Sequence, residues 1–452
     1  MPAATSRPAA ASSSLQADPS SSSTIVHFKG HINFRARLVL SLLSARPIII
    51  TAIRPNALSP GLKDFEASFL RLIEKITNGS KVEISYTGTT VKFLPGTIAG
   101  GSVTHDCGTS RGIGYFLEWI AILAPFAKKE MTLTLKGLTS VEGDMGADLL
   151  RTVHLPWLAQ FLPPATSLAS PLELRILKRG HAPLGGGEVF FRCPLLPNVS
   201  SAGPAGGGMS GSGGGGGMLR SVNFVNAGKV KRIRGIATAA RVSPAMANRM
   251  VERARKILNR YVPDLYIFAD VYRGDESGKS PGFSLSLLTQ STTSSTHYSE
   301  SHSTPGAIPE EVAISCVHSL LSSLQTGGCV PPSLQAGTLL MMASSPEDVS
   351  RVKVGTLVPG AIQMMRDLES LWGLRFLIRR VEQETQEGAG LPQEEAGEEE
   401  EEDSEDDSED SDDQGVVLKR QSRSRPSAVA SMADEFVLSC RGVGVRGHRK
   451  AT

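Results

Sequence analysis

Apolar and polar positions along residues 47–93 follow strand and helix periods in turn. The isoleucine-rich run 47–53 (PIIITAI) is typical of a buried β-strand, and residues 81–86 followed by 90–93 have the pattern of a hairpin. The intervening segment predicts a helix that stops at Asn78-Gly79, where glycine permits a left-handed residue. Its apolar side chains recur at helical spacing: Phe65, Phe69, Leu72, Ile73 and Ile76.

A second amphipathic pattern predicts a helix over residues 244–261, with Ser243 as N-cap and Pro244 in the first turn. Its apolar face comprises Ala247, Met250, Val251, Ala254, Ile257, Leu258 and Tyr261. Its other face comprises Arg249, Arg253, Arg255, Lys256 and Arg260. These cations are suited to binding phosphates, but a solvated surface explains a basic helix face equally well.

Three segments of biased composition interrupt this alternation of strands and helices. Residues 200–217 are rich in Gly and Ser, which indicates a linker or surface loop. Residues 382–413 contain 18 acidic side chains and no Lys or Arg, and a Ser/Arg-rich stretch, 419–427, follows. Residues 436–440 again have a strand pattern, so we expect the acidic run to be a loop from which the chain returns to the body.

The acidic run and the rest of the chain carry opposite net charges. The full 452 residues carry 47 Lys and Arg against 45 Asp and Glu, but outside the acidic run only 27 acidic residues remain. The resulting excess of 20 positive charges is typical of proteins that bind nucleic acid. Any single one of these cations is still more simply explained as solvated surface.

Other function classes find little support in the composition. The longest apolar stretch, 112–126, is interrupted by Glu118 and is shorter than the roughly 20 residues that a membrane span needs. Residues 1–24 lack the apolar core of a secretory signal and predict a disordered leader. The five cysteines are scattered without metal-ligand or disulfide spacing, which fits the cytosol or the nucleus. We therefore expect no membrane, no metal site and no cofactor.

Several glycine-rich and basic blocks follow one another through most of the chain. They are residues 33–41 (NFRARLVLS), 88–96 (GTTVKFLPG) with Gly100-Gly101, 106–116 (DCGTSRGIGYF), Arg179-Gly180 leading into 185–189 (GGGEV), 240–244 (ARVSP) and 277–283 (SGKSPGF). In this order they resemble the RNA 3'-terminal phosphate cyclase-like proteins, the non-catalytic, ribosome-biogenesis branch of the RNA 3'-terminal phosphate cyclase family.

The resemblance implies an α/β fold (α+β repeats): a cyclase-like body of repeated units, each a small sheet with two helices, and a smaller α/β domain inserted after the 185–187 turn. The expected organisation is a leader (1–24), the first part of the body (25–187), the inserted domain (188–282, with the Gly/Ser loop at 200–217), the second part of the body (283–381), a disordered acidic and then Ser/Arg-rich insertion (382–431), and a final strand with a basic tail (432–452).

Three departures from the catalytic cyclases are expected to abolish nucleotidyl transfer. The family's nucleophilic histidine precedes an Asp-Gln pair, and the matching stretch here, 331–335 (PPSLQ), contains no histidine. The glycine-rich opening segment with its glutamate is replaced by residues 30–35 (GHINFR). The small residues after the Gly-Thr pair are replaced by Arg111-Gly112.

Three tempting motifs have simpler structural explanations. Gly185-Gly186-Gly187 leads into a strand, not a helix N-terminus, so a tight turn is favoured over a phosphate cradle. Gly274 and Gly278-Lys279-Ser280 lack the spacing of a phosphate-binding loop and predict a surface loop. His105, Asp106 and Cys107 adjoin in sequence, which does not orient them for catalysis, so a structural role is expected.

The resemblance implies a binding and assembly factor for early pre-rRNA processing in the nucleolar small-subunit processome, with pre-rRNA and a ribosome-biogenesis GTPase as partners and the nucleus and nucleolus as location. We expect phosphate contacts from Lys and Arg in or near the blocks. These RNA-binding candidates are Arg35, Arg37, Arg54, Arg111, Lys178, Arg179 and Arg241.

Two enzymatic alternatives remain at this point. An endoribonuclease needs clustered acid and base groups, for which Asp144, Asp148, Glu347 and Asp348 are available without diagnostic spacing. A residual cyclase is opposed by the missing histidine. For the acidic run, competition with RNA for the basic body and a purely solubilising role also both remain open.

Overall fold

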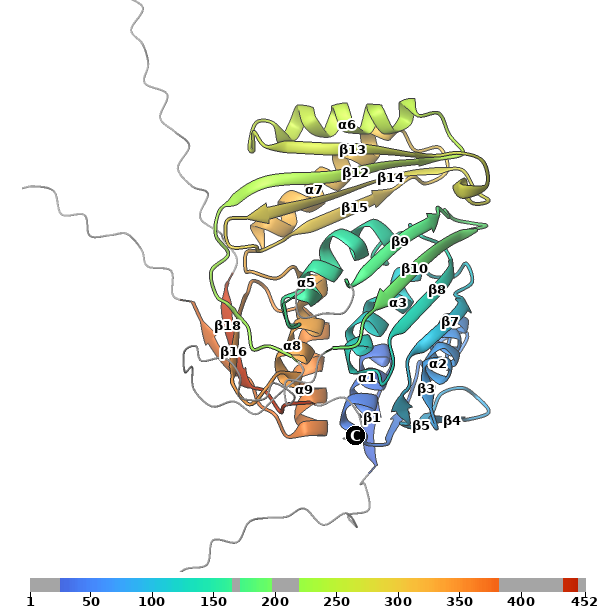
Figure 1. Ribbon diagram of the computed structural model, residues 1–452, viewed down its shortest axis with the longest axis vertical. Coiled ribbons are helices and arrows are strands. Elements are labelled where there is room, and N and C mark those ends of the chain that lie inside the picture. Colours follow the sequence, from blue (N-terminus) through green and yellow to red (C-terminus); the bar gives the residue numbers. More distant parts are fainter. Residues whose placement is uncertain (1–24, 165–170, 197–218, 382–433, 446–452) are drawn as a thin grey trace, which may run out of the picture.

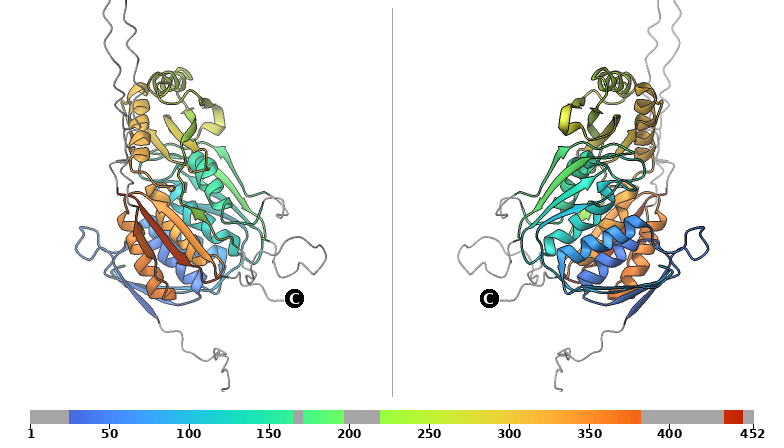
Figure 2. Two further views of the ribbon diagram at one scale, coloured as in Figure 1. Left: turned by 90° about the vertical axis from the view of Figure 1, so that its left-hand side faces the viewer. Right: turned by 90° about the vertical axis from the view of Figure 1, so that its right-hand side faces the viewer.

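Three of the four-stranded sheets repeat one unit (Figures 1 and 2). The structure, a computed structural model, describes residues 25–164, 171–196, 219–381 and 434–445. In each repeated unit, two parallel strands are followed by two further strands, and the last strand lies between the second and the third, antiparallel to both. This repetition confirms the predicted body of sheet-plus-two-helix units.

The first unit confirms the elements expected from the apolar pattern. It consists of β1 (Val26–Lys29), α1 (Phe34–Ser44), β2 (Ile48–Thr51), α2 (Asp64–Ile76), β4 (Lys81–Ile84) and β5 (Val91–Leu94). Helix α2 begins where the backbone N–H of Lys63 donates to the Glu66 carboxylate (2.9 Å). It ends at Ile76, after which β3 (Thr77–Asn78) pairs with β6 (Thr97–Ile98) and Gly79 has a φ of 83°.

The second and third units use the same order of elements. The second consists of β7 (Gly101–Asp106), α3 (Ile113–Leu123), β8 (Met131–Gly137), a helix in three consecutive segments, α4 (Ala147–Leu149), η2 (Leu150–His154) and α5 (Leu155–Ala159), and the strands β9 (Glu173–Lys178) and β10 (Gly187–Cys193). The third consists of β11 (Asn223–Phe224), η6 (Pro332–Leu334), α8 (Gln335–Ser344), β16 (Val349–Val354), α9 (Pro359–Trp372), β17 (Leu377–Arg380) and β18 (Phe436–Arg441).

A fourth sheet, which we call the small sheet, is inserted into the third unit between β11 and η6. The inserted segment contains, in chain order, β12 (Val230–Ala240), α6 (Ala245–Leu258), β13 (Leu265–Tyr272), η5 (Gly274–Ser277), β14 (Gly282–Ser291), β15 (Tyr298–His302) and α7 (Pro309–Gln325). Its strand order is β13-β12-β14-β15, and both helices pack on one face. Figure 1 shows it at one end of the molecule.

The structure corrects the predicted boundaries of this insertion, 188–282. Strand β10 belongs to the second unit, because it pairs along its length with β8 and β9. Strands β14 and β15 belong to the small sheet, because β14 pairs with β12 from Val230 to Ala240. The inserted unit therefore spans residues 230–325.

The predicted amphipathic helix is α6, and its apolar face is buried as expected up to Leu258. Ser243 Oγ accepts a hydrogen bond from the backbone N–H of Ala245 (3.3 Å), although the residue in the N-cap position is Pro244. Tyr261 lies beyond the end of the helix and is exposed, which corrects its assignment to the buried face. On the basic face, Arg249 forms an ion pair with Glu310 of α7.

The helices of the three units pack against one another and leave the sheets outside. Helix α1 contacts α3 and α9, and α8 contacts the same two helices. Their apolar side chains form one continuous core, whereas the small sheet and its two helices enclose a second one. All five cysteines are buried and free. Within the described ranges, no helix is long and apolar enough to cross a membrane.

The chain returns to the body after the acidic run, as predicted. Strand β18 is an inner strand of the third sheet, between β16 and β17. The backbone N–H of Val381 donates to the carbonyl oxygen of Glu435 (2.9 Å), so the chain leaves the sheet and re-enters it at neighbouring positions. The predicted leader, Gly/Ser loop, acidic and Ser/Arg-rich insertion and most of the basic tail lie outside the described residues.

Candidate functional site

A pocket of about 450 Å³ opens where the first turns of α1 and α3 meet α2 and the segment before α8. Its wall carries three of the seven predicted RNA-contact residues, Arg35, Arg54 and Arg111. Pro332 and Ser333 of η6 form another part of the wall, so the pocket includes two residues of the stretch 331–335, in which the resemblance led us to expect the missing histidine. We call this candidate functional site the arginine pocket.

Two of its arginines contact the same tyrosine. Arg35, in the first turn of α1, donates to the backbone oxygen of Tyr115 and to the Glu118 carboxylate (3.1 Å). Its guanidinium carbon lies 4.1 Å from the centroid of the Tyr115 ring. The guanidinium carbon of Arg111 lies 4.7 Å from the same centroid, and its Nε donates to Asp144 (2.8 Å). The Tyr115 ring and the two carboxylates therefore fix both guanidinium groups.

The third arginine is fixed by a carboxylate that also caps a helix. Arg54, in the loop after β2, donates from its two terminal nitrogens to the two oxygens of Glu66 (2.8 and 2.7 Å). The same carboxylate accepts the backbone N–H of Lys63 at the start of α2. Such a bidentate pair restricts the guanidinium to one orientation, with little freedom to follow a ligand.

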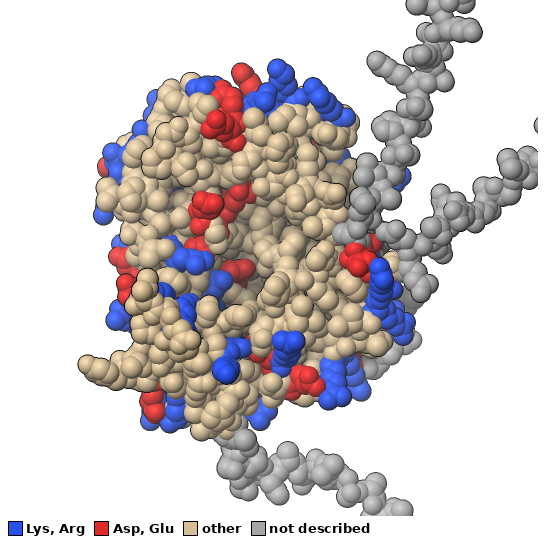
Figure 3. All heavy atoms as spheres, turned by 180° about the vertical axis from the view of Figure 1, so that it is seen from behind, with Lys and Arg blue, Asp and Glu red and all other residues tan. Residues whose placement is uncertain are grey.

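Each positive charge of the pocket is thus balanced by a carboxylate. Hydrogen bonds to Glu66 and Asp144 raise the pKa of Arg54 and of Arg111, so both remain charged. Burial raises the pKa of Glu118 although Arg35 opposes this effect, and burial raises the pKa of Tyr115 to about 12. Figure 3 shows basic and acidic side chains side by side around a hollow on the rear face. A phosphate entering the arginine pocket must compete with these carboxylates.

The chemistry near η6 offers little activation of a nucleophile. The Ser333 hydroxyl shares a hydrogen bond with the Tyr298 hydroxyl, and burial raises the pKa of that phenol well above its usual range. His31 also lines the pocket, and partial burial, with Arg54 nearby, lowers the pKa of its imidazole. The neutral His31 imidazole is therefore the side chain of the pocket that a test for a covalent intermediate must include.

Comparison with known proteins agrees with the order of the sequence blocks. The model of the RNA 3'-terminal phosphate cyclase family matches residues 26–378. The chain belongs to this family. It is 44% identical to the rRNA processing protein rcl1 of Schizosaccharomyces pombe, over 80% of this chain and 94% of the relative. It is also 44% identical to the human RNA 3'-terminal phosphate cyclase-like protein, over 76% of this chain and 87% of the relative. Its identity to the rRNA processing protein RCL1 of Saccharomyces cerevisiae is 36%, over 80% of this chain and 92% of the relative.

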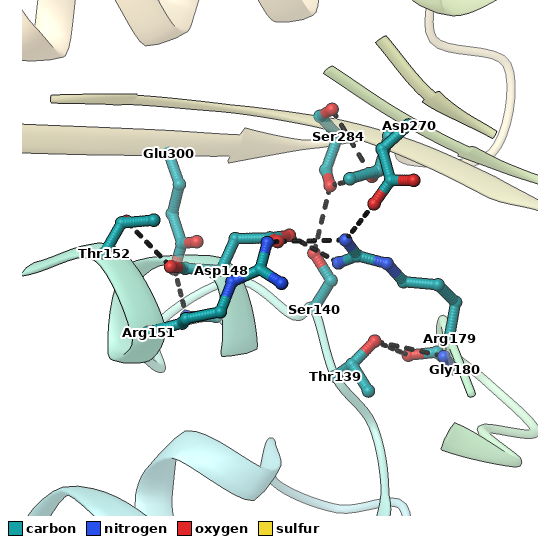
Figure 4. A network of polar contacts seen from close by, with 12 residues as sticks. Thr139, Ser140, Asp148, Arg151, Thr152, Arg179, Gly180, Asp270, Ser284 and Glu300 are labelled. Atoms are coloured by element: carbon teal, nitrogen blue, oxygen red, sulfur yellow. Dashed lines mark hydrogen bonds and ion pairs between the residues drawn. The ribbon is translucent and has the colours of Figure 1, made fainter. Parts of the chain in front are cut away.

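Two of the candidates chosen from the family blocks are structural. The side chain of Arg37 is 2% exposed, and its Nε donates to Asp367 of α9 (2.9 Å). The side chain of Arg179 is 1% exposed and donates to Asp148 and to Asp270 of β13 (2.8 Å to the latter), as Figure 4 shows. Buried guanidinium groups held in this way cannot reach an RNA phosphate. The structure therefore removes Arg37 and Arg179 from the candidates.

The two remaining candidates lie outside the arginine pocket. Lys178 is half-buried at the end of β9. Arg241 follows β12, and its Nε donates to the carbonyl oxygen of Gly278 (2.7 Å). The structure thus brings Arg35, Arg54 and Arg111 together and leaves Lys178 and Arg241 as separate surface positions.

The glycine motifs hold the small sheet against the second unit. Gly185 and Gly186 have positive φ angles and turn the chain into β10, which confirms the predicted turn. The loop around Gly278 is not a free surface loop as predicted. The backbone N–H of Lys279 donates to Gly185 (2.9 Å), and Ser280, which is buried, accepts the N–H of Leu184 (3.0 Å). The two motifs therefore bind each other.

His105 and Cys107 have the structural surroundings expected of them. His105 is buried, with Nε2 3.0 Å from Ser68 Oγ, and burial lowers the pKa of its imidazole to about 4. Burial raises the pKa of the Cys107 thiol above its usual range, which disfavours a thiolate nucleophile. Asp106 accepts the N–H of Gly108 (2.9 Å).

The four carboxylates considered for an endoribonuclease each have another partner. Asp144 and Asp148 bind Arg111 and Arg179, as described above. Glu347 pairs with Arg441, and Asp348 accepts from Ser221 (2.8 Å). Among the described residues, no three His, Cys, Asp or Glu side chains are arranged to hold a metal ion. The geometry thus provides no observation in favour of nuclease chemistry.

Sequence reasoning missed the partners that fix the pocket. Tyr115 and Glu118 lie three residues apart on α3, a spacing that places them on one face, and this was the available signal. Glu66 and Asp144 gave no signal, because they reach their arginines through tertiary packing.

Proposed function

We propose that this chain is a ribosome-biogenesis factor of the small-subunit processome, required for early pre-rRNA processing and without cyclase activity. The observation that carries the proposal is its similarity to the fission yeast rRNA processing protein over nearly the whole length of that relative. Coverage of this extent includes the repeated units as well as the inserted small sheet.

The wall of the arginine pocket supports a non-catalytic role. Pro332 and Ser333 occupy the stretch in which the cyclases carry their histidine, and neither provides an imidazole nucleophile. The arginines that line the pocket are engaged by carboxylates, an arrangement that fixes structure and leaves little charge for a triphosphate.

The location and the partners form part of the same proposal. The excess of 20 positive charges outside the acidic run supports association with pre-rRNA. The nucleolus and a ribosome-biogenesis GTPase rest on the family resemblance alone. Affinity purification of the tagged chain from nucleoli should recover that GTPase together with small-subunit precursor RNA. Recovery of neither would remove both partners from the proposal.

Conditional depletion of the chain in its own cells tests the function directly. We expect unprocessed small-subunit precursors to accumulate on northern blots, while mature large-subunit rRNA is still made. Re-expression of the intact chain should restore processing. Normal small-subunit maturation after depletion would contradict the proposed function.

Absence of cyclase activity has a separate test. Incubation of the purified protein with α-labelled ATP or GTP and a divalent cation should leave it unlabelled, because residues 331–335 lack the imidazole that accepts the nucleotide. A catalytic cyclase of the family serves as the positive control. An acid-labile adduct that disappears in a His31→Ala variant would show that the pocket uses a different histidine.

A further inference from the structure

A second cavity, of about 1220 Å³, lies between the small sheet, α5 and the segment around β11. None of the described residues that line it is Asp or Glu, in contrast to the arginine pocket. Two lining residues are cations, Lys231 and Arg232 of β12. Many others carry amides or hydroxyls: Gln160, Asn223, Asn226, Gln290, Ser291, Thr292, Thr293, Ser294, Ser295 and Thr296.

Within the part of the chain that the structure describes, the two cations of this cavity have no carboxylate partner. Neither Lys231 nor Arg232 forms an ion pair with any described residue, and both are exposed. Arg232 instead donates to the side-chain oxygen of Gln290, which orients the guanidinium at the cavity wall. The hydrogen bond from Arg234 (2.8 Å) lowers the pKa of one nearby carboxylate, Asp264, and the charges of Arg232 and Lys231 act on it in the same direction. Three cations around one carboxylate leave a local positive excess.

Two aromatic side chains extend this surface along the edge of the small sheet. Tyr266 and Phe268 of β13 are 56% and 51% exposed. They alternate with Ile267, which is buried against the helices, so they lie on the opposite face of the sheet. Their register partners on β12 are Arg234 and Ile236. They therefore share a sheet face with Arg234. The cavity begins two residues before Arg234 on the same strand, at Arg232.

The same face of β13 marks where the small sheet meets the body. Two residues beyond Phe268, Asp270 binds Arg179 of the second unit, and Tyr272 lies 5.0 Å from that guanidinium carbon. Tyr266 and Phe268 are thus exposed beside a fixed junction and not on a mobile end. Figure 1 shows α5 below the small sheet, on the side where Trp157 and Pro156 complete the cavity.

We propose that this surface, which we call the small-sheet groove (the cavity with Lys231 and Arg232, continued by Tyr266 and Phe268), binds single-stranded RNA. Unpaired cations attract phosphates, exposed aromatic rings accept unstacked bases, and amide and hydroxyl groups reach base edges and 2'-hydroxyls. Absence of carboxylates from the described lining favours a polyanion over a basic peptide. The inference rests on the proposed association with pre-rRNA and places it on a surface that the sequence blocks do not contain.

Fluorescence anisotropy with a short, labelled single-stranded RNA tests the groove on the intact purified chain. Lys231→Ala combined with Arg232→Ala should weaken binding about tenfold at low salt. It should also reduce the slope of log affinity against log salt by about 1.4, because each neutralised phosphate of a single strand contributes about 0.7. Tyr266→Ala combined with Phe268→Ala should weaken binding about thirtyfold and leave that slope unchanged.

Matched variants separate the groove from general charge and surface effects. Lys128→Ala with Lys129→Ala removes two exposed cations elsewhere, and Tyr86→Ala removes an exposed ring. Both control proteins should bind RNA as the unmodified chain does. Circular dichroism and thermal melting show whether each variant is folded.

Several results would overturn the inference. Unchanged RNA affinity in both groove variants would do so, as would equal losses in the groove and control variants. Loss of a co-purified protein with RNA affinity intact would identify the groove as a protein-docking site instead. Each of these results concerns the groove alone, since the proposed function is judged by the depletion experiment on the whole chain.

Discussion

Two arginines whose side chains are almost fully buried form ion pairs between parts of the chain that are far apart in sequence. Arg37 connects α1 of the first unit to Asp367 on α9 of the third. Arg179 connects the second unit to Asp270 of the small sheet (Figure 4). A buried charge without its partner is costly, so these pairs impose one arrangement of the units more than they add net stability.

Replacement of Arg179 should show this cost. Arg179→Leu leaves the buried Asp148 carboxylate with only the longer contact to the more exposed Arg151 (3.5 Å), and we expect the free energy of unfolding to fall by about 3–5 kcal/mol. Urea unfolding followed by circular dichroism measures the change. Arg192→Ala, which removes a more exposed pair with Glu130, is the control and should leave the midpoint unchanged. Equal midpoints for the Arg179 variant and the unmodified chain would contradict the structural role.

Histidine burial predicts a dependence of stability on pH. Neither ring nitrogen of His154 has a hydrogen-bond partner among the residues that the structure describes, and burial lowers the pKa of this imidazole to about 3. The unfolded chain binds a proton at this residue near pH 6.5, whereas the folded chain does not. The contribution of neutral His154 to the free energy of unfolding is therefore fully present above pH 6.5. It falls by about 1.4 kcal/mol per pH unit as the pH decreases from 6.5 toward 3.

A His154→Leu variant should show a shallower decline in the free energy of unfolding between pH 6.5 and pH 4. Replacement of the exposed His318 by Gln is the control and should leave the slope as it is. Identical slopes for the His154 variant and the unmodified chain would exclude His154 as a source of the acid sensitivity.

At the scale of elements, local sequence patterns predicted strands, helices and the hairpin of β4 and β5, but not the pairing of strands that are distant in sequence. The run 47–53, the helix before Asn78 and the helix after Pro244 follow from periodicity, which depends on neighbouring residues. The boundary of the inserted unit was missed because β10 has the same alternating pattern whether it pairs with β8 or begins a new sheet. Pairing between distant strands decides such a boundary, and a single sequence does not record it.

In the candidate site, too, the sequence identified residues but not the tertiary contacts that decide their roles. Proximity to the family blocks identified Arg35, Arg54 and Arg111, but it identified Arg37 and Arg179 equally, and only burial distinguishes the two sets. The small-sheet groove contains no residue of the blocks, and its aromatic residues Tyr266 and Phe268 are ordinary strand formers in sequence.

Removal of the acidic run should leave the third sheet intact. The hydrogen bond between Val381 and Glu435 brings the two flanking strands together, so the remaining residues suffice to connect them after deletion of residues 384–413. We expect a cooperative unfolding transition close to that of the full chain, measured by calorimetry. A loss of several kcal/mol would mean that this segment contributes packed structure.

The whole molecule combines a basic body with a covalently attached run of 18 carboxylates. Attachment keeps these charges at high effective concentration beside any basic surface, including the small-sheet groove. If they compete with RNA, deletion of residues 384–413 should tighten RNA binding at low salt, and the advantage should shrink as salt screens both interactions.

A salt titration of RNA affinity for the deleted and intact proteins measures this effect. Aspartate at Ser404, Ser408 and Ser411 adds negative charge and should weaken binding. As a control, a scrambled run of the same composition should behave like the native one. Equal affinities of the deleted and intact proteins at every salt concentration would leave the run with a solubilising role.

The position of β18 has a consequence for synthesis of the protein. The first two units are complete once residue 193 has left the ribosome, whereas the inner strand of the third sheet is added only at residues 436–441. Until then β16 and β17 lack the strand that joins them, and their edges are open to pairing with other chains. A nascent chain that stalls within the acidic run would expose the unpaired edges of β16 and β17. The last folding step therefore requires the ribosome to translate the whole acidic run first.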